Sequence, residues 1–310
     1  MFRITLRQLE IFRAVAHRGS TAAAAQQLPL SQSATSAGLN QLERSLGVRL
    51  FDRVGKRLAL NADGKAMLPK ALGILDNARL LESGEGRSGK FDLNLHASTT
   101  IGNYLVPRLL AGFRRECPQG RLEARIGNTL EVIRAVQDFS AELGLIEGPC
   151  REPDLVVTPW IADELVVIAA PTHPLARAAK RRPLTIDQLA AGPWLLREPG
   201  SGTREAVDLA VLPHLDAYRE VRVLGSSEAI KNAAAFGLGV SCLSRWVVHD
   251  LVRARRLAIL DTRLPVLRRR LSIVWHREKT LSAGLSRFID HCRSLRASSG
   301  SPRDAAVQRR

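Results

Sequence analysis

The chain has 310 residues, 45% of them hydrophobic and 25% charged, a balance that excludes disorder over most of its length and allows several domains. Its apolar runs fall far short of the roughly 20 residues that a membrane span needs. The 46 Lys and Arg against 30 Asp and Glu give a net charge of +16, which favours an anionic partner, nucleic acid first.

Three short helices are predicted near the N-terminus. Apolar residues at helical spacing predict the first over 6–16. Ser20 is placed to cap a second helix, which Pro29 ends. A third helix is capped by Ser31 and ends at Gly47. Two short helices joined by a tight turn describe a helix-turn-helix unit.

The third helix and the segment after it carry the candidate DNA contacts. Residues 48–60 contain a Val-Gly-Lys tip between β-prone flanks and predict a two-stranded wing. Five basic residues and one acid lie between Arg44 and Arg57. Short polar and basic side chains contact phosphates or base edges in a major groove. The alternative is a solvated charged loop. The expected DNA-binding residues are Ser31, Gln32, Ser33, Ser36, Asn40, Arg44, Arg53, Lys56 and Arg57.

Residues 6–64 contain a long run of motifs in one continuous stretch. The motifs lie at 6–12, 31–34, 41–43 and 46–53 and at Gly64. This stretch closely resembles the DNA-binding domain of LysR-type transcriptional regulators. Two departures affect the expected operator preference. Residues 35–38 lack a basic residue that the family often carries, and 61–64 replace its usual Leu-Thr-x-x-Gly ending.

A long helix is predicted from a cap at Asn61 to about Ser83, bent locally by Pro69. Its apolar stripe favours pairing with the same helix of a second subunit, as the family's linker helix does. Packing on its own domain is the alternative. A flexible hinge is expected over 83–89. The stripe comprises Leu68, Leu72, Leu75 and Ala78.

From Phe91 onward, strands and helices alternate, which implies parallel-rich sheets with ligand sites at the carboxyl ends of the strands. Strands are predicted at 91–97, 121–127, 142–147, 155–158, 165–170, 194–197, 221–224, 239–243 and 271–275. Helices are predicted at 104–116, 129–139, 204–209, 227–236 and 244–253. One sheet of nine strands is an open alternative. The resemblance to the periplasmic-binding-protein-like effector domain of the same family favours two lobes, with chain crossings near 161–165 and 268–271.

The expected fold class is therefore α/β, with an N-terminal winged helix-turn-helix, a long linker helix and a two-lobed periplasmic-binding-protein-like effector domain. The DNA-binding domain takes 1–60 and the linker helix and hinge 61–89. The effector domain takes 90–296, with lobe I at about 90–162 and 269–296 and lobe II at about 163–268. A disordered tail is expected at 297–310.

Three hydroxyl-bearing loops, each ending a strand and opening a helix, are candidate anion sites: 96–102, 199–203 and 225–228. Simple capping is the alternative for each, and in the family all three positions line the effector cleft. Glu147 and Gly148 end another strand, where Glu147 would bind an ammonium group or hold the hinge. The candidate effector residues are Ser98, Thr99, Thr100, Ile101, Glu147, Gly148, Ser201, Gly202, Thr203, Ser226 and Ser227.

The combination of 98–104, 146–149, 197–203 and 226–231 is similar to the branch of these regulators that governs sulfur assimilation and sulfite handling. That resemblance implies a sulfur oxyanion or a related metabolite as effector. The chemistry of the polar loops would equally suit a phosphate or a carboxylate.

Two other function classes compete with a regulator. A cytoplasmic α/β enzyme could use the same loops to hold a phosphorylated or carboxylated substrate, but no HExxH, GxSxG or P-loop motif is present. A solute-binding protein is disfavoured by the helix-turn-helix. No catalytic residue, metal or cofactor is expected.

Cysteine usage and the N-terminus indicate the compartment. The four cysteines form no CxxC pair, and the first 16 residues contain three arginines and a glutamate, unlike a secretory signal. A cytoplasmic protein with structural thiols is expected, with redox sensing as the alternative. The expected partners are a near-palindromic double-stranded DNA operator, a small-molecule effector, further copies of the chain in a dimer or tetramer, and RNA polymerase.

Overall fold

The computed structural model describes residues 2–55, 57–83, 92–215 and 217–298. Two compact units are present: Met1–Ser88 with Arg277–Ser282, and Gly89–His276 with Ala283–Arg310. We call them the N-terminal and C-terminal units. Most of the expected hinge (84–89) and of the expected tail (299–310) lies outside the described residues.

Three helices open the N-terminal unit, as predicted: α1 (Leu6–Arg18), α2 (Thr21–Gln27) and α3 (Gln32–Leu46). The hydroxyls of Ser20 and Ser31 accept hydrogen bonds from the backbone of α2 and α3, each at 3.1 Å. Gly19 and Gly47 end α1 and α3 in the left-handed conformation, which glycine adopts without steric cost. The predicted caps are therefore confirmed.

The predicted wing is also confirmed. Strands β1 (Phe51–Val54) and β2 (Arg57–Leu60) form an antiparallel hairpin in which Arg53 lies opposite Leu58. The side chain of Asn61 caps the next helix, α4 (Ala62–Ser83), by accepting the N–H of Gly64 at 2.8 Å. Sequence reasoning located this start because Asn is a favoured N-cap.

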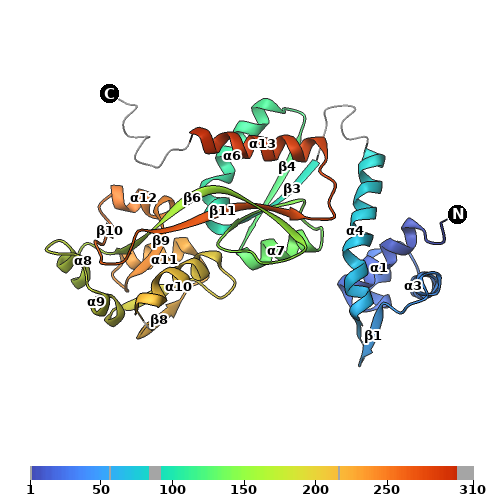
Figure 1. Cartoon of the computed structure of the whole chain (residues 1–310), viewed down its shortest axis with the longest axis horizontal. Coiled ribbons are helices and arrows are strands. Elements are labelled where there is room, and N and C mark those ends of the chain that lie inside the picture. The colour runs from blue at the N-terminus through green and yellow to red at the C-terminus, as the bar shows by residue number, and fades with distance from the viewer. Residues whose placement is uncertain (1, 56, 84–91, 216, 299–310) are drawn as a thin grey trace. The chain divides into compact units, whose positions relative to one another are not determined.

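Helix α4 packs on its own unit, where α1 lies next to it and crosses it (Figure 1). Leu75 is in the core of the helix-turn-helix and Leu68 packs against that core, so the alternative of packing on its own domain is confirmed for these two residues; Leu72 is also buried. A second apolar face remains open. Ile74 is 45% exposed and Leu81 is 85% exposed, seven residues apart on the helix.

A seven-stranded mixed sheet organises the C-terminal unit, in the order β10-β6-β11-β5-β3-β4, with β9 paired to β6. Only β3 with its neighbours β4 and β5 is parallel, and the pairs made by β6 and β11 are antiparallel. The expectation of parallel-rich sheets is thus met only in part, because most pairs of the main sheet are antiparallel. The strands are β3 (Asp92–Ser98), β4 (Arg121–Gly127), β5 (Leu143–Glu147), β6 (Leu155–Ala169), β9 (Ser241–Ser244), β10 (Ala258–Ile259) and β11 (Leu267–His276), with a separate parallel pair β7 (Pro193–Leu196) and β8 (Glu220–Val223).

Strand β6 corrects the prediction of two separate strands at 155–158 and 165–170. Pro159, inside β6, has no N–H to donate to the ladder. Its partner on β11 is Ser272, at a shift in register between Leu271 and Ser272. Proline is tolerated at such a bulge, so the strand continues. Figure 1 shows β6 and β11 running side by side through the whole unit.

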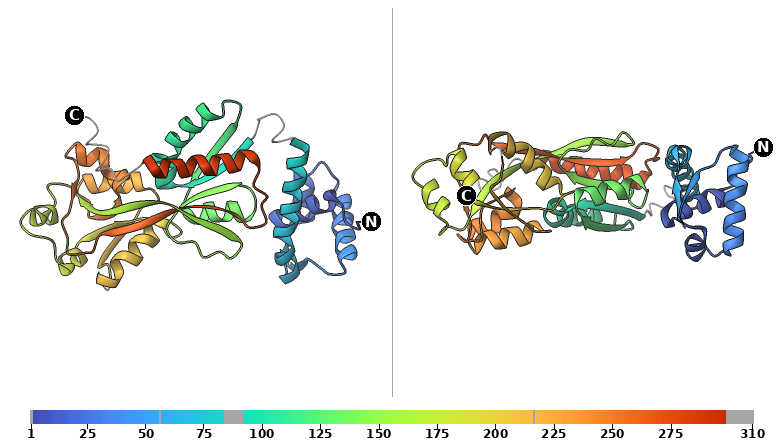
Figure 2. Two further views of the ribbon diagram at one scale, coloured as in Figure 1. Left: turned by 45° about the horizontal axis from the view of Figure 1, so that its top comes forward. Right: turned by 90° about the horizontal axis from the view of Figure 1, so that it is seen from below.

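Nine helices surround the sheet in the described part of this unit. The predicted helix 104–116 is confirmed as α6, which begins two residues later, and the short helix α5 precedes it. Helices α6 and α13 cover one face and α7 the other (Figures 1 and 2). The helices are α5 (Thr99–Tyr104), α6 (Val106–Glu116), α7 (Thr129–Gln137), α8 (Pro174–Ala179), α9 (Ile186–Ala191), α10 (Gly202–Leu215), α11 (Ser227–Ala235), α12 (Arg245–Arg253) and α13 (Ala283–Ser298).

The C-terminal unit has two lobes with separate cores. Lobe I, containing α5–α7, α13 and β3–β5, is built around Phe113 and Phe288, whose rings meet edge to face. Lobe II, containing α8–α12 and β7–β10, is built around Trp194 and Val211. Strands β6 and β11 connect the lobes. No helix in the described residues is long and apolar enough to cross a bilayer.

Candidate functional site

The predicted DNA-binding side chains lie on one helix and one hairpin of the N-terminal unit. Except for half-buried Ser36 and for Lys56, which lies outside the described residues, all are exposed. Ser31 also has a structural task, because its hydroxyl caps α3 and contacts the hydroxyl of Ser33 at 2.9 Å. Arg53 and Arg57 project from the two strands of the wing.

Three hydrogen bonds fix the wing against the helices. The N–H of Leu50 donates to Glu43 Oε1 at 2.7 Å, and the side-chain amide of Asn61 donates to the carbonyl of Arg49 at 2.9 Å. The N–H of Leu58 donates to the carbonyl of Gly19 at 2.7 Å. The basic side chains of the wing therefore stand on a hairpin tied at its base.

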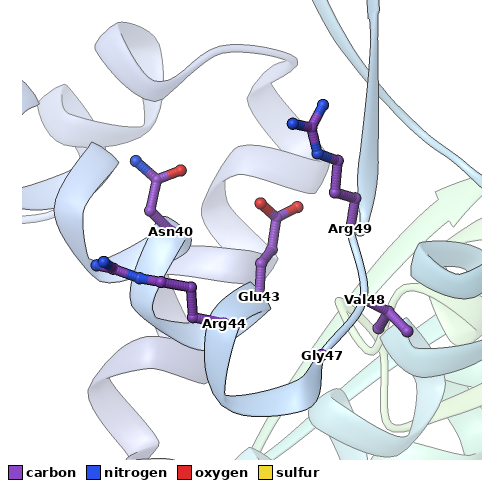
Figure 3. A pocket seen from close by; sticks show the side chains of 6 residues that line it. All are labelled: Asn40, Glu43, Arg44, Gly47, Val48 and Arg49. Atoms are coloured by element: carbon purple, nitrogen blue, oxygen red, sulfur yellow. The ribbon is translucent and has the colours of Figure 1, made fainter.

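A surface pocket lies where α3 ends and the wing begins (Figure 3). In that view the guanidinium groups of Arg44 and Arg49 lie on opposite sides of Glu43. Sequence reasoning did not select Arg49 as a DNA contact. The feature of the sequence that could have identified Arg49 is the density of basic residues between Arg44 and Arg57. The lining residues are Asn40, Glu43, Arg44, Gly47, Val48 and Arg49.

In the C-terminal unit, a buried ion network joins the strands where the lobes meet. Arg269 on β11 pairs with Glu147 at the end of β5, with Nη1 2.6 Å from Oε2, and with Asp163 on β6, with Nε 2.7 Å from Oδ2. All three side chains are almost completely buried. One guanidinium thus serves two carboxylates in the interior.

Threonines from both lobes complete the network. The N–H and hydroxyl of Thr100 donate to the carboxylate of Glu147 at 2.7 and 2.9 Å. The hydroxyl of Thr203, in lobe II, donates to Glu147 Oε2 at 2.7 Å and accepts from Arg269 at 2.9 Å. Glu147 therefore has the hinge-holding arrangement that was one of its two expected roles, and these two hydroxyls are already engaged.

The two carboxylates respond to this environment in opposite directions. Burial raises the pKa of Glu147, but Arg269 and the threonine hydrogen bonds lower it by more, so it lies below its ordinary value. Burial keeps the pKa of Asp163 above its ordinary value despite Arg269. The carboxylate with three threonine donors thus carries the charge more readily.

Two of the predicted effector residues are glycines, Gly148 and Gly202, and the backbones of the two lobes approach closely at them. Gly148 has φ +84°, and a Cβ there would lie 2.9 Å from the carbonyl oxygen of Gly202. A Cβ at Gly202 would lie 1.7 Å from the carbonyl oxygen of Glu147. The N–H of Gly202 donates to Thr129 Oγ1 at 3.1 Å. The glycine-rich loop thus rests on lobe I.

A buried arginine connects the other two hydroxyl loops. Arg197, directly after β7, donates to Ser227 Oγ at 2.9 Å and to Thr99 Oγ1 in lobe I at 3.3 Å. Its remaining partner is the carboxylate of Glu198. Sequence reasoning did not select Arg197 as an effector residue, although it belongs to the segment 197–203 on which the family resemblance rests.

The other predicted effector residues have local surroundings. Ile101 is in the core of lobe I. Ser226 caps α11, and the hydroxyl of Ser201 accepts the N–H of Arg204 at 3.4 Å. The hydroxyl of Ser98 is buried and has no hydrogen-bond partner in the described part of the chain.

A second link between the lobes runs through Tyr104 on α5. Its hydroxyl donates to Glu228 and accepts from Lys231 at 3.3 Å, and Lys231 also pairs with Asp250 at 3.0 Å. Burial, together with the hydrogen bond to Glu228, raises the pKa of Tyr104 to about 12. The tyrosine therefore stays protonated as a donor at neutral pH.

The described residues contain no group of three or more His, Cys, Asp and Glu side chains placed to hold a metal. All four cysteines are free thiols, and burial raises the pKa of Cys242 to about 12. A thiol of that pKa is a poor nucleophile at neutral pH, in agreement with a structural role for Cys242.

Comparison with known proteins gives the chain a family. Residues 6–65 match the bacterial regulatory helix-turn-helix protein of the lysR family, and residues 86–297 match the LysR substrate binding domain. The chain is 50% identical over 289 residues to the "Uncharacterized HTH-type transcriptional regulator YeiE" of Escherichia coli (strain K12). The matched residues cover 93% of this chain and 97% of that protein. It is 32% identical to the HTH-type transcriptional regulator CysL of Bacillus subtilis (strain 168), over 86% of this chain and 89% of the relative.

A solved structure adds a ligand-bound neighbour. The regulatory domain of CcmR from Synechocystis PCC6803, in complex with 2-PG, is 33% identical, with a TM-score of 0.60 over 68% of this chain and 100% of that chain. The relatives and both matched families are regulators of transcription rather than enzymes. The chain therefore belongs to the LysR family of transcriptional regulators, which bind DNA through the helix-turn-helix and a small-molecule effector through the two-lobed domain.

Proposed function

We propose that the cleft between the two lobes binds a small anionic metabolite and that its binding changes how the protein holds its operator. The observation that carries this proposal is the buried guanidinium of Arg197, which bonds to Thr99 of lobe I and Ser227 of lobe II. Guanidinium groups and hydroxyls are the donors that oxyanions and carboxylates use. A ligand seated there would prefer one arrangement of the lobes, which is what allostery requires.

Within this class we propose a sulfur oxyanion, sulfite first, because the loops resemble those of sulfur-responsive regulators. The test is a thermal-shift screen against sulfite, sulfate, thiosulfate, O-acetylserine, phosphate and several carboxylates. An upward shift with a sulfur compound supports the sulfur assignment. Shifts with phosphate or carboxylates alone would remove sulfur and keep the anion cleft, and no shift with any anion would contradict the cleft.

Thr100→Ala should abolish most of the effector response while leaving operator affinity nearly unchanged. The substitution removes the 2.9 Å bond to Glu147 in the C-terminal unit and touches nothing in the helix-turn-helix. Operator binding with and without effector, measured by fluorescence anisotropy, checks this. Ser140→Ala, which removes from an exposed residue of the same lobe a hydroxyl bonded only to the carbonyl of Ala135 at 3.2 Å, is the control. A normal response in Thr100→Ala would remove this residue from the effector mechanism.

We propose that a dimer binds DNA with its two α3 helices in successive major grooves, about 34–36 Å apart, and with its wings on the flanking phosphates. We add Arg49 to the predicted contacts because it flanks the pocket at the end of α3. A regulator that acts on DNA works where the chromosome lies, so the proposal includes a cytoplasmic location. RNA polymerase at the adjacent promoter is the further partner.

Arg53→Ala should weaken operator binding and reduce the slope of log affinity against log salt by about one, because one phosphate contact is lost. Anisotropy titrations at several salt concentrations measure both quantities. Arg108→Ala, which removes an exposed arginine from the C-terminal unit, controls for net charge. Unchanged affinity and slope in Arg53→Ala would refute the wing contact.

We propose that the subunits pair through the open face of α4. Ile74 and Leu81 keep a seven-residue spacing and remain exposed after Leu72 and Leu75 are buried. Ile74→Glu should shift the protein toward monomer in sedimentation velocity and weaken operator binding. Lys70→Glu, an exposed charge change on the same helix, should leave the dimer intact. An unchanged dimer in Ile74→Glu would place the interface elsewhere.

A further inference from the structure

The main partner of the buried Arg197 guanidinium is its own neighbour in sequence. Its Nε and Nη2 atoms donate to the two carboxylate oxygens of Glu198, each at 2.8 Å. Consecutive side chains of a strand point to opposite faces, but β7 ends at Leu196, so both side chains turn to one side. The result is a bidentate pair between adjacent residues.

The two partners differ in their access to solvent. The side chain of Arg197 is 3% exposed and that of Glu198 is 25% exposed. A buried cation without an anionic partner is strongly unfavourable, so the guanidinium requires a negative group. The carboxylate of Glu198 is partly exposed to solvent, so it can move away from Arg197 into water. Burial raises the pKa of Glu198 but the Arg197 hydrogen bonds lower it by more, which keeps this carboxylate ionised at neutral pH.

Further polar side chains lie in the segments that meet Arg197 and Glu198. The side chain of Asn128, at the start of α7 in lobe I, is near enough to Glu198 to help lower the pKa of this carboxylate. The hydroxyl of Ser98, one residue before Thr99, is buried without a partner in the described residues. Sulfite, phosphate and carboxylates present the same pair of oxygens to a guanidinium as Glu198 does. An exchange of anions would therefore keep the charge on Arg197 compensated.

We propose that Glu198 is a built-in competitor of the effector, whose carboxylate occupies on Arg197 the position that an anionic ligand takes by displacing it. This inference rests on the proposed anion cleft and names its charged anchor. The apparent Kd equals the intrinsic Kd divided by the fraction of molecules in which Arg197 is free. The strength of the Arg197–Glu198 pair therefore sets the effector concentration at which the regulator responds.

Calorimetric titration of the full chain with sulfite, and separately with phosphate, tests the proposal. Glu198→Gln keeps the size of the side chain and removes its charge, so the Kd for the anion that the unmodified protein binds should fall at least about tenfold. Arg197→Gln should bind neither anion. Glu220→Gln, which removes the same charge from an exposed pair with Arg222, should leave the Kd unchanged. Thermal melts establish that each variant is folded.

Each outcome decides one of the two proposals. If the unmodified protein binds the anion and Glu198→Gln has an unchanged or higher Kd, the role of Glu198 as competitor is refuted. The proposal of an anion cleft then still stands. An equal gain in Glu220→Gln would assign the effect to net charge and refute the role of Glu198 as competitor too. If neither the unmodified protein nor Glu198→Gln binds either anion, the proposal of an anion cleft is refuted, and with it the proposal that Glu198 competes with the effector.

Discussion

Replacing Arg269 by methionine should lower the free energy of unfolding of the protein by about 3–5 kcal/mol. Methionine fills much of the same volume but leaves two carboxylates, Glu147 and Asp163, buried without their cation. A buried charge that loses its partner costs more than the pair contributes, because its desolvation is no longer compensated. Chemical denaturation of the C-terminal unit, followed by tryptophan fluorescence, measures the change.

Arg270→Met is the matched control, since Arg270 is the next residue of β11 and is exposed. It should change stability by less than about 0.5 kcal/mol, as surface substitutions usually do. Equal stabilities of Arg269→Met and Arg270→Met would mean that the ion network contributes nothing to the folded state. Operator affinity should be retained in both variants, because neither residue belongs to the N-terminal unit.

Gly202→Ala should separate the two lobes at the glycine-rich loop. The added Cβ would lie 1.7 Å from the carbonyl oxygen of Glu147, a backbone atom that cannot move aside independently. The loop must shift, which breaks the Gly202–Thr129 hydrogen bond and weakens that of Thr203 to Glu147. We expect a loss of about 1–3 kcal/mol or more of stability, together with loss of the effector response.

Hydrogen exchange at the amide of Gly202, together with a thermal melt, checks this expectation. Gly225→Ala is the control, because a Cβ there meets nothing within 4 Å. It should leave exchange and effector response as they are. A Gly202→Ala protein with ordinary stability and a full response would show that the lobes do not need this close approach.

The N-terminal unit follows from local sequence. Ser20, Ser31 and Asn61 start helices and Gly19 and Gly47 end them, because capping depends on side chains within a few residues of the helix end. The wing follows for the same reason. Its hairpin joins neighbouring strands and requires no distant partner.

Errors in the C-terminal unit arose where distant segments decide. The two strands predicted at 155–158 and 165–170 are one strand, because the bulge opposite Ser272 lets β6 continue past Pro159. Asp163 lies inside this strand, and its charge is compensated by Arg269, more than a hundred residues away.

The sequence by itself determined the helix-turn-helix, the alternation of strands and helices, and which loops carry hydroxyls, because these depend on contacts between near neighbours. Only the tertiary structure decided what those hydroxyls do. Thr100 and Thr203 serve Glu147, whereas Thr99 and Ser227 meet Arg197. The partners come from different lobes, and a buried charge takes whichever group the fold brings within hydrogen-bond distance.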